Sequence, residues 1–442
     1  MSIGNLKDEG NKGNNFPWQL KMLQGLNAIS TGITNLLGAF GSGITANTPA
    51  ASQDASYRSR VSQLTTLGDL KSINRYRTDV WLQNSTGTGT VAWSSNNTFT
   101  LGVSALNDTA IIQSKVSYPY FSGKSQLIEC TFSRFEPITN VTKRVGYYDY
   151  FAPGGKLDGF WLESDGVNGV SLVFLNGLGG VEYHYPVADW TNKDFINYDW
   201  SQFTVVMFDF LWLGGLRLRL FVSGPNGFTL AHEVDYAGQF GETETFIGYP
   251  SHPVTYEMTS TKGSPGGSIV FNPICAQVAS EGAIDKAGIM RACGTGTTAI
   301  TLASSASSYP ILGIRKGYAN SPIKLVSFEL SVATNNDRLY WEIQINPTLS
   351  ANISYSQIDA QSTTLYGVGN GTITVSTPGR VIASGYLSTG QSIRSVNFED
   401  NFLATLGGTS PGTSFVPDSY VLVVKPITTP VNVLAVMQVK EL

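Results

Sequence analysis

Two short acidic pairs are the residues in this chain best suited to chemistry. Glu163-Ser164-Asp165 and Glu242-Thr243-Glu244 each place two carboxyl groups on one side of an extended segment. A glycoside-cleaving site needs two such groups, roughly 5 to 9 Å apart, on either side of the scissile bond. The E-x-D-x-x-E pattern of some jelly-roll glycosidases is incomplete, because Asn168 stands at the third acidic position. Neighbouring glycines favour solvated turns, so we expect both pairs to be loop acids.

A second group of charged residues spans neighbouring predicted strands: Asp209, Arg217, Arg219, His232 and Glu233. Gathered on one sheet face, these side chains could form a site for a carbohydrate or an anion. The alternative is cross-strand charge pairing on a solvated or inter-subunit face, because antiparallel sandwiches commonly carry polar residues there. The sequence favours charge pairing and leaves the binding site open.

Aromatic side chains offer a further carbohydrate-binding surface, because exposed rings can stack on other rings. The candidates are Tyr147–Phe151, Trp190 and Trp200, but with 20 Tyr, 22 Phe and 8 Trp most rings must belong to the core. Asp149 and the loop acids could ligate calcium, yet the sequence contains no EF-hand loop. The three histidines and three cysteines lack metal-ligand spacing. We therefore predict no metal, no cofactor and no catalytic residue, and a protein that is not an enzyme.

These residues lie in short apolar or alternating runs, separated by Gly, Pro and Asn turn signals, which predict β-strands. In the first part of the chain they are Val80–Leu82, Thr98–Val103, Thr109–Ser114, Ser125–Phe135, Arg144–Tyr150, Phe160–Leu162, Val170–Leu175, Val181–Tyr185, Phe203–Trp212, Leu216–Val222, Thr229–Asp235 and Val254–Met258. In the last part they are Ile311–Ile314, Ile323–Val332, Leu339–Ile345, Ile353–Ser356, Thr372–Ser376, Val381–Leu387, Tyr420–Val424 and Val431–Val439. In Leu216–Val222 the even positions face a core, and Arg217 and Arg219 share the opposite face.

One convincing helix precedes these strands, over residues 16–40. Asn15 is suited to the N-cap and Pro17 to the first turn. Apolar side chains then follow a heptad rhythm, which favours packing against a partner helix. The candidate docking and oligomerisation residues are Trp18, Met22, Leu26, Ile29, Ile33, Leu36 and Phe40. The same stripe fits either copies of itself or another protein of a larger particle.

The order of these elements predicts an all-β fold: two tandem jelly-roll-like antiparallel β-sandwich domains preceded by an N-terminal amphipathic helix. We predict an anchor and helix over residues 1–45, a linker over 46–77, which includes a polar and partly helical segment, and a first sandwich over 78–290. We then predict a linker rich in small polar residues over 291–308 and a second sandwich over 309–442.

Composition narrows the partners. Charged residues make up 14% of the chain and the net charge is −4, with no run of Lys or Arg, so we expect no nucleic-acid partner. The longest apolar run of the body is too short to span a bilayer, and the first residues lack the pattern of a signal peptide. We therefore expect that the protein does not insert into a membrane and that it is made in a cytoplasm.

Several segments resemble structural proteins of tailed-bacteriophage virions. The block Phe208–Arg219, the segments Leu230–Val234 and Tyr249–Glu257, and the stretch Asn335–Thr348 are similar to recurring parts of such proteins. The leader Gly10–Leu20 resembles leaders of structural proteins in phages of Bacteroidetes-type hosts. The resemblance implies a virion protein with β-sandwich domains, as a fibre, tail or neck adaptor, or head decoration, and it supplies no catalytic residues.

The sequence and the resemblance together favour a non-enzymatic virion component made in the host cytoplasm. We expect a homo-oligomer, preferably a trimer, that docks on a capsid, portal or tail protein through its N-terminal segment. The alternative is a carbohydrate-binding adhesin that attaches to a host surface glycan, with the second sandwich outermost. A polysaccharide depolymerase ranks last.

Overall fold

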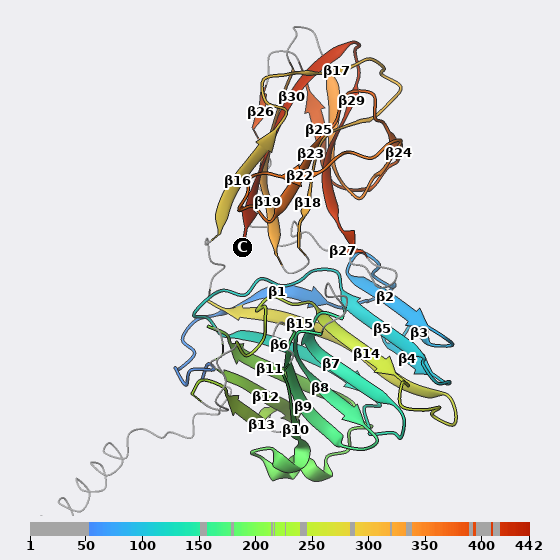
Figure 1. Cartoon of the computed structure of the whole chain (residues 1–442), viewed down its shortest axis with the longest axis vertical. Coiled ribbons are helices and arrows are strands. Elements are labelled where there is room, and N and C mark those ends of the chain that lie inside the picture. Colours follow the sequence, from blue (N-terminus) through green and yellow to red (C-terminus); the bar gives the residue numbers. More distant parts are fainter. Residues whose placement is uncertain are drawn as a thin grey trace, which may run out of the picture. The chain divides into compact units, whose positions relative to one another are not determined.

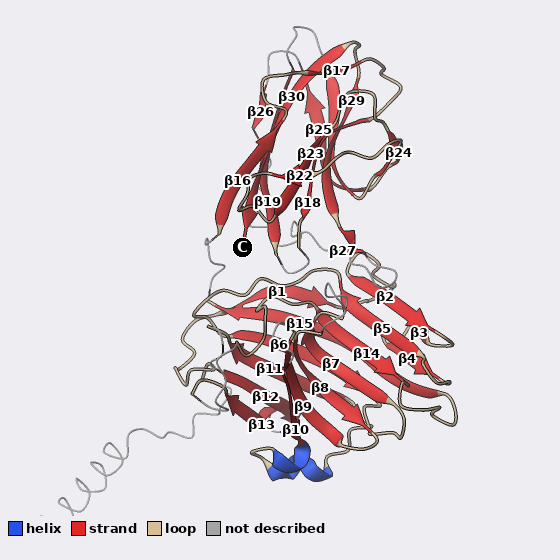
Figure 2. Cartoon of the chain, viewed as in Figure 1, coloured by secondary structure: helices blue, strands red, loops and turns tan. Residues whose placement is uncertain are grey.

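A computed structural model of the protein describes residues 53–150, 157–177, 181–213, 215, 217–225, 227–238, 245–282, 288–318, 321–332, 338–388, 392–394, 408–409 and 416–442. The described chain is almost entirely β-structure, with two short 3-10 helices (Figure 2). All strand pairs with described registers are antiparallel, which confirms the predicted all-β fold class. The predicted helix and its residues from Trp18 to Phe40 lie outside the described residues.

The first sandwich consists of two sheets (Figure 1). Its front sheet has the order β10-β9-β8-β7-β14-β5-β2, and its back sheet has the order β13-β12-β11-β6-β15-β4-β3, with β1 paired to β15. The front strands are β2 (Trp81–Thr86), β5 (Thr109–Ser114), β7 (Thr142–Tyr148), β8 (Gly159–Asp165), β9 (Gly169–Asn176), β10 (Val181–Pro186) and β14 (Val254–Thr259). The back strands are β1 (Leu64–Leu70), β3 (Thr90–Trp93), β4 (Phe99–Val103), β6 (Gln126–Ser133), β11 (Thr204–Leu211), β12 (Arg217–Gly224), β13 (Gly227–Asp235) and β15 (Ile269–Glu281). The 3-10 helices η2 (Val187–Asp189) and η3 (Lys193–Asn197) follow β10.

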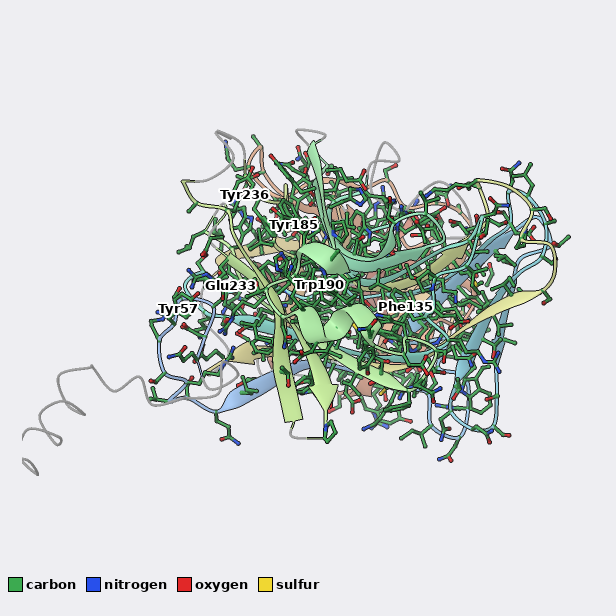
Figure 3. The ribbon with its side chains drawn as sticks, turned by 90° about the horizontal axis from the view of Figure 1, so that it is seen from below. Tyr57, Phe135, Tyr185, Trp190, Glu233 and Tyr236 are labelled. Atoms are coloured by element: carbon green, nitrogen blue, oxygen red, sulfur yellow. The ribbon has the colours of Figure 1, made fainter. Side chains whose placement is uncertain are left out.

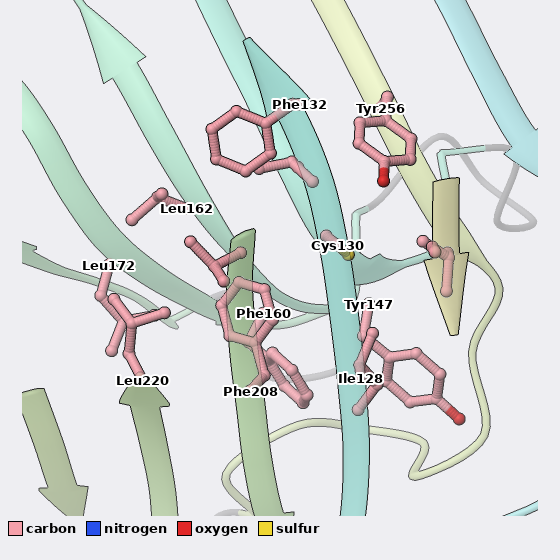
Figure 4. Close-up of a cluster of buried hydrophobic side chains, with 14 of the residues drawn as sticks. Ile128, Cys130, Phe132, Tyr147, Phe160, Leu162, Leu172, Phe208, Leu220 and Tyr256 are labelled. Atoms are coloured by element: carbon pink, nitrogen blue, oxygen red, sulfur yellow. The ribbon is translucent and has the colours of Figure 1, made fainter. Parts of the chain in front are cut away.

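Alternation along the strands places one side of each sheet in a shared hydrophobic core. Its central side chains, shown in Figure 4, include Ile128, Cys130, Phe132, Tyr147, Phe160, Leu162, Leu172, Phe208, Leu220 and Tyr256. The alternation predicted for β12 is confirmed, because Leu218, Leu220 and Val222 are fully buried in this core. Burial of this much apolar and aromatic surface is the main force that holds the two sheets together.

The second sandwich has its own core, which extends from Cys293 to Val439. One sheet has the order β16-β30-β19-β26, with β17 paired to β30, and the other has the order β22-β23-β18-β29-β20-β25. The strands of the first are β16 (Ile289–Gly294), β17 (Ile300–Leu302), β19 (Ile323–Val332), β26 (Ser392–Arg394) and β30 (Val431–Glu441). Those of the second are β18 (Tyr309–Lys316), β20 (Leu339–Ile345), β22 (Ser356–Gln357), β23 (Thr364–Val368), β25 (Arg380–Leu387) and β29 (Ser419–Pro426). Two short pairs complete the described strands: β21 (Thr348–Leu349) with β24 (Val375–Thr377), and β27 (Gly408–Thr409) with β28 (Val416–Pro417).

Both predicted linkers contain strands, so the predicted boundaries need correction. In the segment 46–77, β1 pairs with β15 from Leu64 to Leu70 and extends the back sheet. In the segment 291–308, β16 and β17 both pair with β30 of the second sandwich. The sequence misled because two of these strands are short and all three lie in stretches rich in small polar residues, while their pairing is with strands distant in the sequence.

Candidate functional site

The front sheet carries an unusual group of side chains on the face opposite the core. In β7 and β8 the residues that alternate with the core positions are Arg144, Tyr148, Trp161 and Glu163. The β7–β8 register places Arg144 directly opposite Glu163, and β14 places Glu257 opposite Arg144 on its other side. Strand pairing therefore aligns two carboxylates across one guanidinium.

Arg144 is the centre of this group. Its Nε donates to Glu163 Oε2 (2.7 Å), its Nη1 donates to Glu257 Oε1 (3.4 Å), and its guanidinium carbon lies 5.3 Å from the centre of the Trp161 ring. Trp161 Nε1 and Tyr148 Oη donate to the same two carboxylates, to Glu163 at 3.3 Å and to Glu257 at 3.0 Å. Burial lowers the pKa of Arg144, but the two carboxylates outweigh it and hold that pKa above its usual range. The guanidinium is therefore a permanent, oriented cation.

A small apolar cluster lies beside this charged group on the same face of the sheet. Tyr148, Trp161 and Val173 are fully buried, and Tyr150 and Leu157 pack against them from the segment between β7 and β8. Burial, followed by the neighbouring Glu257, raises the pKa of Tyr148 well above its ordinary value, so this phenol stays protonated as a donor.

Asp158 fixes the segment that carries Leu157. Its carboxylate accepts hydrogen bonds from the backbone N–H groups of Gly177 (2.8 Å), Gly248 (2.7 Å) and Tyr249 (2.9 Å), and His252 Nε2 lies 2.9 Å away. Burial opposes ionisation, but the hydrogen bonds of His252 and of the backbone prevail and lower the pKa of Asp158. One buried carboxylate thus joins three chain segments beside the site.

The site reaches solvent at Arg144 and at the edge strand β10. The Arg144 side chain is 21% exposed, and those of Glu182 and His184 are each 40% exposed. Glu182 Oε1 lies 2.9 Å from His184 Nε2, and this contact raises the pKa of His184 against the opposing effect of burial. The Glu163 charge also raises the pKa of His184, whereas the Arg144 charge lowers it. The same face of the front sheet therefore exposes a guanidinium on β7 and, beyond β9 and β8, a carboxylate and an imidazole on β10.

The predicted acidic pair Glu163 and Asp165 is divided between two roles. The prediction that Glu163 is a loop acid is wrong, because it is a buried residue within β8. Asp165 does serve a turn: its Oδ1 accepts from the N–H groups of Val167 (2.7 Å) and Asn168 (2.6 Å), and its Oδ2 contacts Lys262 Nζ (3.0 Å). Glu242 and Glu244 lie outside the described residues.

The predicted charge cluster on the back sheet forms, but this chain covers it. We call residues 53–60 the strap, because they lie across the outer side of β11, β12 and β13. Asp209 accepts from Arg60 Nη2 (2.5 Å), from Arg219 Nη2 and from Ser125 Oγ, and the Asp209 and Arg219 side chains are at most 1% exposed. Arg219 Nη2 also donates to Gln53 O (2.5 Å). The prediction of charge pairing is confirmed, whereas the face is neither solvated nor open.

Tyr57 closes the strap over Arg217. Its ring centre lies 3.9 Å from the Arg217 guanidinium carbon, and its hydroxyl donates to Glu233. Tyr57 and Glu233 are labelled in Figure 3. Arg217 Nη1 also donates to Ala55 O (3.0 Å). His232 lies apart from this cluster: its ring packs against Tyr185, with centroids 5.0 Å apart, and burial lowers its pKa to about 4.

Four of the aromatic residues singled out from the sequence belong to the interior, whereas Tyr150 is half-buried and Phe151 lies outside the described residues. Tyr147, Tyr148 and Trp190 are 0% exposed and Trp200 is 5% exposed, so none of these rings is available to a sugar (Figure 3 labels Trp190). The residues that sequence reasoning missed are Arg144, Trp161 and Glu257. Each lies in or beside a predicted strand, but only the cross-strand register reveals that they meet. Among the described residues, no group of three or more His, Cys, Asp or Glu side chains could hold a metal ion.

Comparison with known proteins adds information on the fold. No protein-family model matches the chain, and no curated protein matches it. Solved structures similar to it include a Bacillus licheniformis β-glucanase (14% identity, TM-score 0.35, covering 48% of this chain and 97% of that chain). Also similar is the Emp47p carbohydrate recognition domain (14% identity, TM-score 0.33, covering 51% of this chain and 100% of that chain). A peanut lectin with a nine-residue peptide is similar as well (14% identity, TM-score 0.31, covering 49% of this chain and 97% of that chain).

At 14% identity the likeness concerns the fold alone, and it extends over about half of this chain. The similar structures include glucanases as well as lectins, which corrects the prediction that the protein is not an enzyme. The described chain is an all-β protein with two jelly-roll-like antiparallel β-sandwiches.

Proposed function

We propose that the protein binds a carbohydrate at the Arg144 face of the front sheet. The observation that carries this proposal is the Arg144 guanidinium, held between Glu163 and Glu257, stacked near Trp161 and exposed at one edge. Such a group combines fixed donors, fixed acceptors and an apolar backing, which is the usual composition of a small-molecule site.

Sugar hydroxyls both donate and accept hydrogen bonds, and the exposed groups of this face can satisfy both roles. Arg144 supplies donors in a planar fork, and Glu182 supplies acceptor oxygens. Hydrogen bonds to ionised groups are about twice as strong as neutral ones. Because Glu163 and Glu257 already fix the guanidinium, little conformational entropy is lost when a ligand docks.

The test is an array of immobilised glycans probed with the full-length protein and with Arg144→Lys. Lysine keeps the positive charge but cannot bridge two carboxylates and a ligand with a planar fork. We expect binding of wild type to at least one glycan class and a loss of about tenfold or more in the variant. Arg75→Lys, at an exposed arginine of the same sandwich, is the matched control and should bind as wild type does.

Thermal unfolding of each variant separates binding from folding. A folded Arg144→Lys protein that binds as well as wild type would place the ligand elsewhere. Absence of binding to every glycan class would overturn the proposal.

A second candidate function is glycoside cleavage, favoured by one specific observation. Glu163 and Glu257 come from two strands and meet at one guanidinium, as a pair of carboxylates on a common face. Glycosidases use such a pair as acid and base or nucleophile. Reducing-sugar release that persists in wild type but is lost in both Glu163→Gln and Glu257→Gln would support this candidate. Binding without release would leave only the first proposal.

We also propose that the protein acts as a virion component, on the basis of the resemblance to phage structural proteins. Immunogold labelling of intact virions tests this directly, and unlabelled particles would contradict it. Light scattering of the purified protein tests the proposed trimer, and a monomer at micromolar concentration would refute it.

A further inference from the structure

A pair of tyrosines, one exposed and one half-buried, lies at one edge of the second sandwich. Tyr340 of β20 and Tyr386 of β25 are directly opposite in the register, and their ring centroids are 5.1 Å apart. Tyr386 is 74% exposed, one of the most exposed large side chains in the described chain. β25 is the last strand of its sheet, so this pair faces solvent on the side away from the core.

The strand alternation explains why the pair stands on the outer face. Leu339, Trp341 and Ile343 of β20 point into the core, which leaves Tyr340 and Glu342 on the opposite side. Gly385 of β25 lies opposite Trp341, and a Cβ atom at this glycine would approach Trp341 Cζ2 to 2.8 Å. The missing side chain thus allows β25 to lie close to the tryptophan, which holds Tyr386 beside Tyr340.

Polar side chains flank the pair on the same face. Lys425 of β29 is paired with Tyr340 in the register, and Ser384 of β25 is paired with Glu342. Lys425 and Ser384 are exposed and Glu342 is half-buried. Gln344 is 1% exposed and donates through Nε2 to Glu342, so one carboxylate oxygen is held in place.

We propose that this surface, formed by Tyr340, Tyr386, Glu342, Ser384 and Lys425, is a second binding site for a neutral saccharide. A pyranose ring can place its apolar face on the exposed Tyr386 ring, as aromatic side chains provide apolar surface at low entropic cost. Its hydroxyls can then bond to the carboxylate, the serine hydroxyl and the ammonium. One cation and one anion flank the rings, which favours an uncharged ligand.

A second copy of the chain is a poorer match for the same surface. The centres of protein–protein interfaces are depleted in charged residues, whereas Lys425 and Glu342 flank this pair on neighbouring strands. The proposal is independent of the Arg144 site, because the residues come from separate sandwiches with separate cores.

The experiment is affinity electrophoresis of the full-length protein in gels that each contain one neutral polysaccharide: mixed-linkage β-glucan, mannan, xylan or dextran. We expect at least one polysaccharide to retard wild type, and Tyr386→Ala to weaken that retardation about tenfold. Tyr386→Phe should retain most of the binding, because the ring remains. Tyr318→Ala, which removes another exposed tyrosine (60% exposed), is the matched control and should behave as wild type does.

Each result has a defined meaning. Retardation that is equal in wild type, Tyr386→Ala and Tyr318→Ala overturns the proposal, as does its absence in all four gels. Light scattering of Tyr386→Ala is run in parallel, and a lower oligomeric mass would assign the pair to an interface between copies and overturn it. Arg144→Lys tests the first site separately. If this variant loses glycan-array binding, and its retardation in the gels is still weakened by Tyr386→Ala, the two sites are independent.

Discussion

Removal of the Asp209 carboxylate should loosen the strap and destabilise the first sandwich. Asp209 is 0% exposed and is shared by Arg60, Arg219 and Ser125. In Asp209→Ala the Arg219 guanidinium, whose side chain is 1% exposed, loses its buried counter-charge. Removal of one partner from a buried ion pair costs about 3 to 5 kcal/mol, because the other charge stays desolvated.

The expected size of this effect is large enough to measure by thermal unfolding. For a domain of this size 1 kcal/mol corresponds to about 2 to 4 °C, so Tm should fall by about 6 to 20 °C. Hydrogen exchange should also show faster exchange at Ala55 N–H, which donates to Ser125 Oγ at 3.3 Å.

Two further variants define the mechanism. Lys71→Ala breaks an exposed ion pair with Asp69, in which the side chains are 51% and 53% exposed, and should change stability by less than about 1 kcal/mol. The double variant Asp209→Ala/Arg219→Met should be less destabilised than the two single costs together, because it leaves no unpaired Arg219 charge. A Tm for Asp209→Ala equal to that of Lys71→Ala would refute the reasoning.

Three other predictions follow from buried groups. Burial lowers the pKa of Lys143, whose side chain is 1% exposed, from 10.5 to about 8. At a pH between these two values, the unfolded chain still binds a proton that the folded chain has lost. Stability of wild type relative to Lys143→Met should therefore rise with pH, by about 3 kcal/mol at most, and a flat difference in pH-dependent urea unfolding would contradict this. Asp158→Ala leaves three backbone N–H groups without their acceptor and should cost about 3 kcal/mol or more in the same assay, whereas a cost below about 1 kcal/mol would exclude the anchoring role. Gly385→Ala should cost about 1 to 3 kcal/mol through its contact with Trp341, visible as a lower Tm of the second sandwich, and an unchanged Tm would contradict the close approach.

The strands with clear patterns were predictable from sequence, and those with mixed patterns were not. Ile323–Val332 and Leu339–Ile345 are strands with the predicted bounds, because continuous apolar or alternating runs indicate buried strands directly. The central strand β15 was missed, since Pro273 and Asn272 interrupt its apolar run. The structure accommodates the proline at a register shift between Pro273 and Cys275, where a bulge removes the need for an N–H donor.

Neither the burial of the back-sheet charge cluster nor the Arg144 site could be predicted from the sequence, because both depend on contacts between segments distant in the chain. Arg219 has the alternation of a solvent-facing residue, but the strap that buries it comes from a segment more than 150 residues earlier in the chain. Glu163 precedes a glycine-containing turn, so its local sequence resembles that of a loop acid. Only the pairing of β7 with β8 and β14 shows that Arg144 joins it to Glu257.

The most direct test of carbohydrate binding at the front sheet is a crystal structure of the protein with the best glycan from the array. We predict a saccharide whose hydroxyls lie within hydrogen-bond distance of the Arg144 guanidinium and of Glu182 or His184. A saccharide bound only at other residues, with an unchanged Arg144 face at saturating concentration, would contradict the proposal.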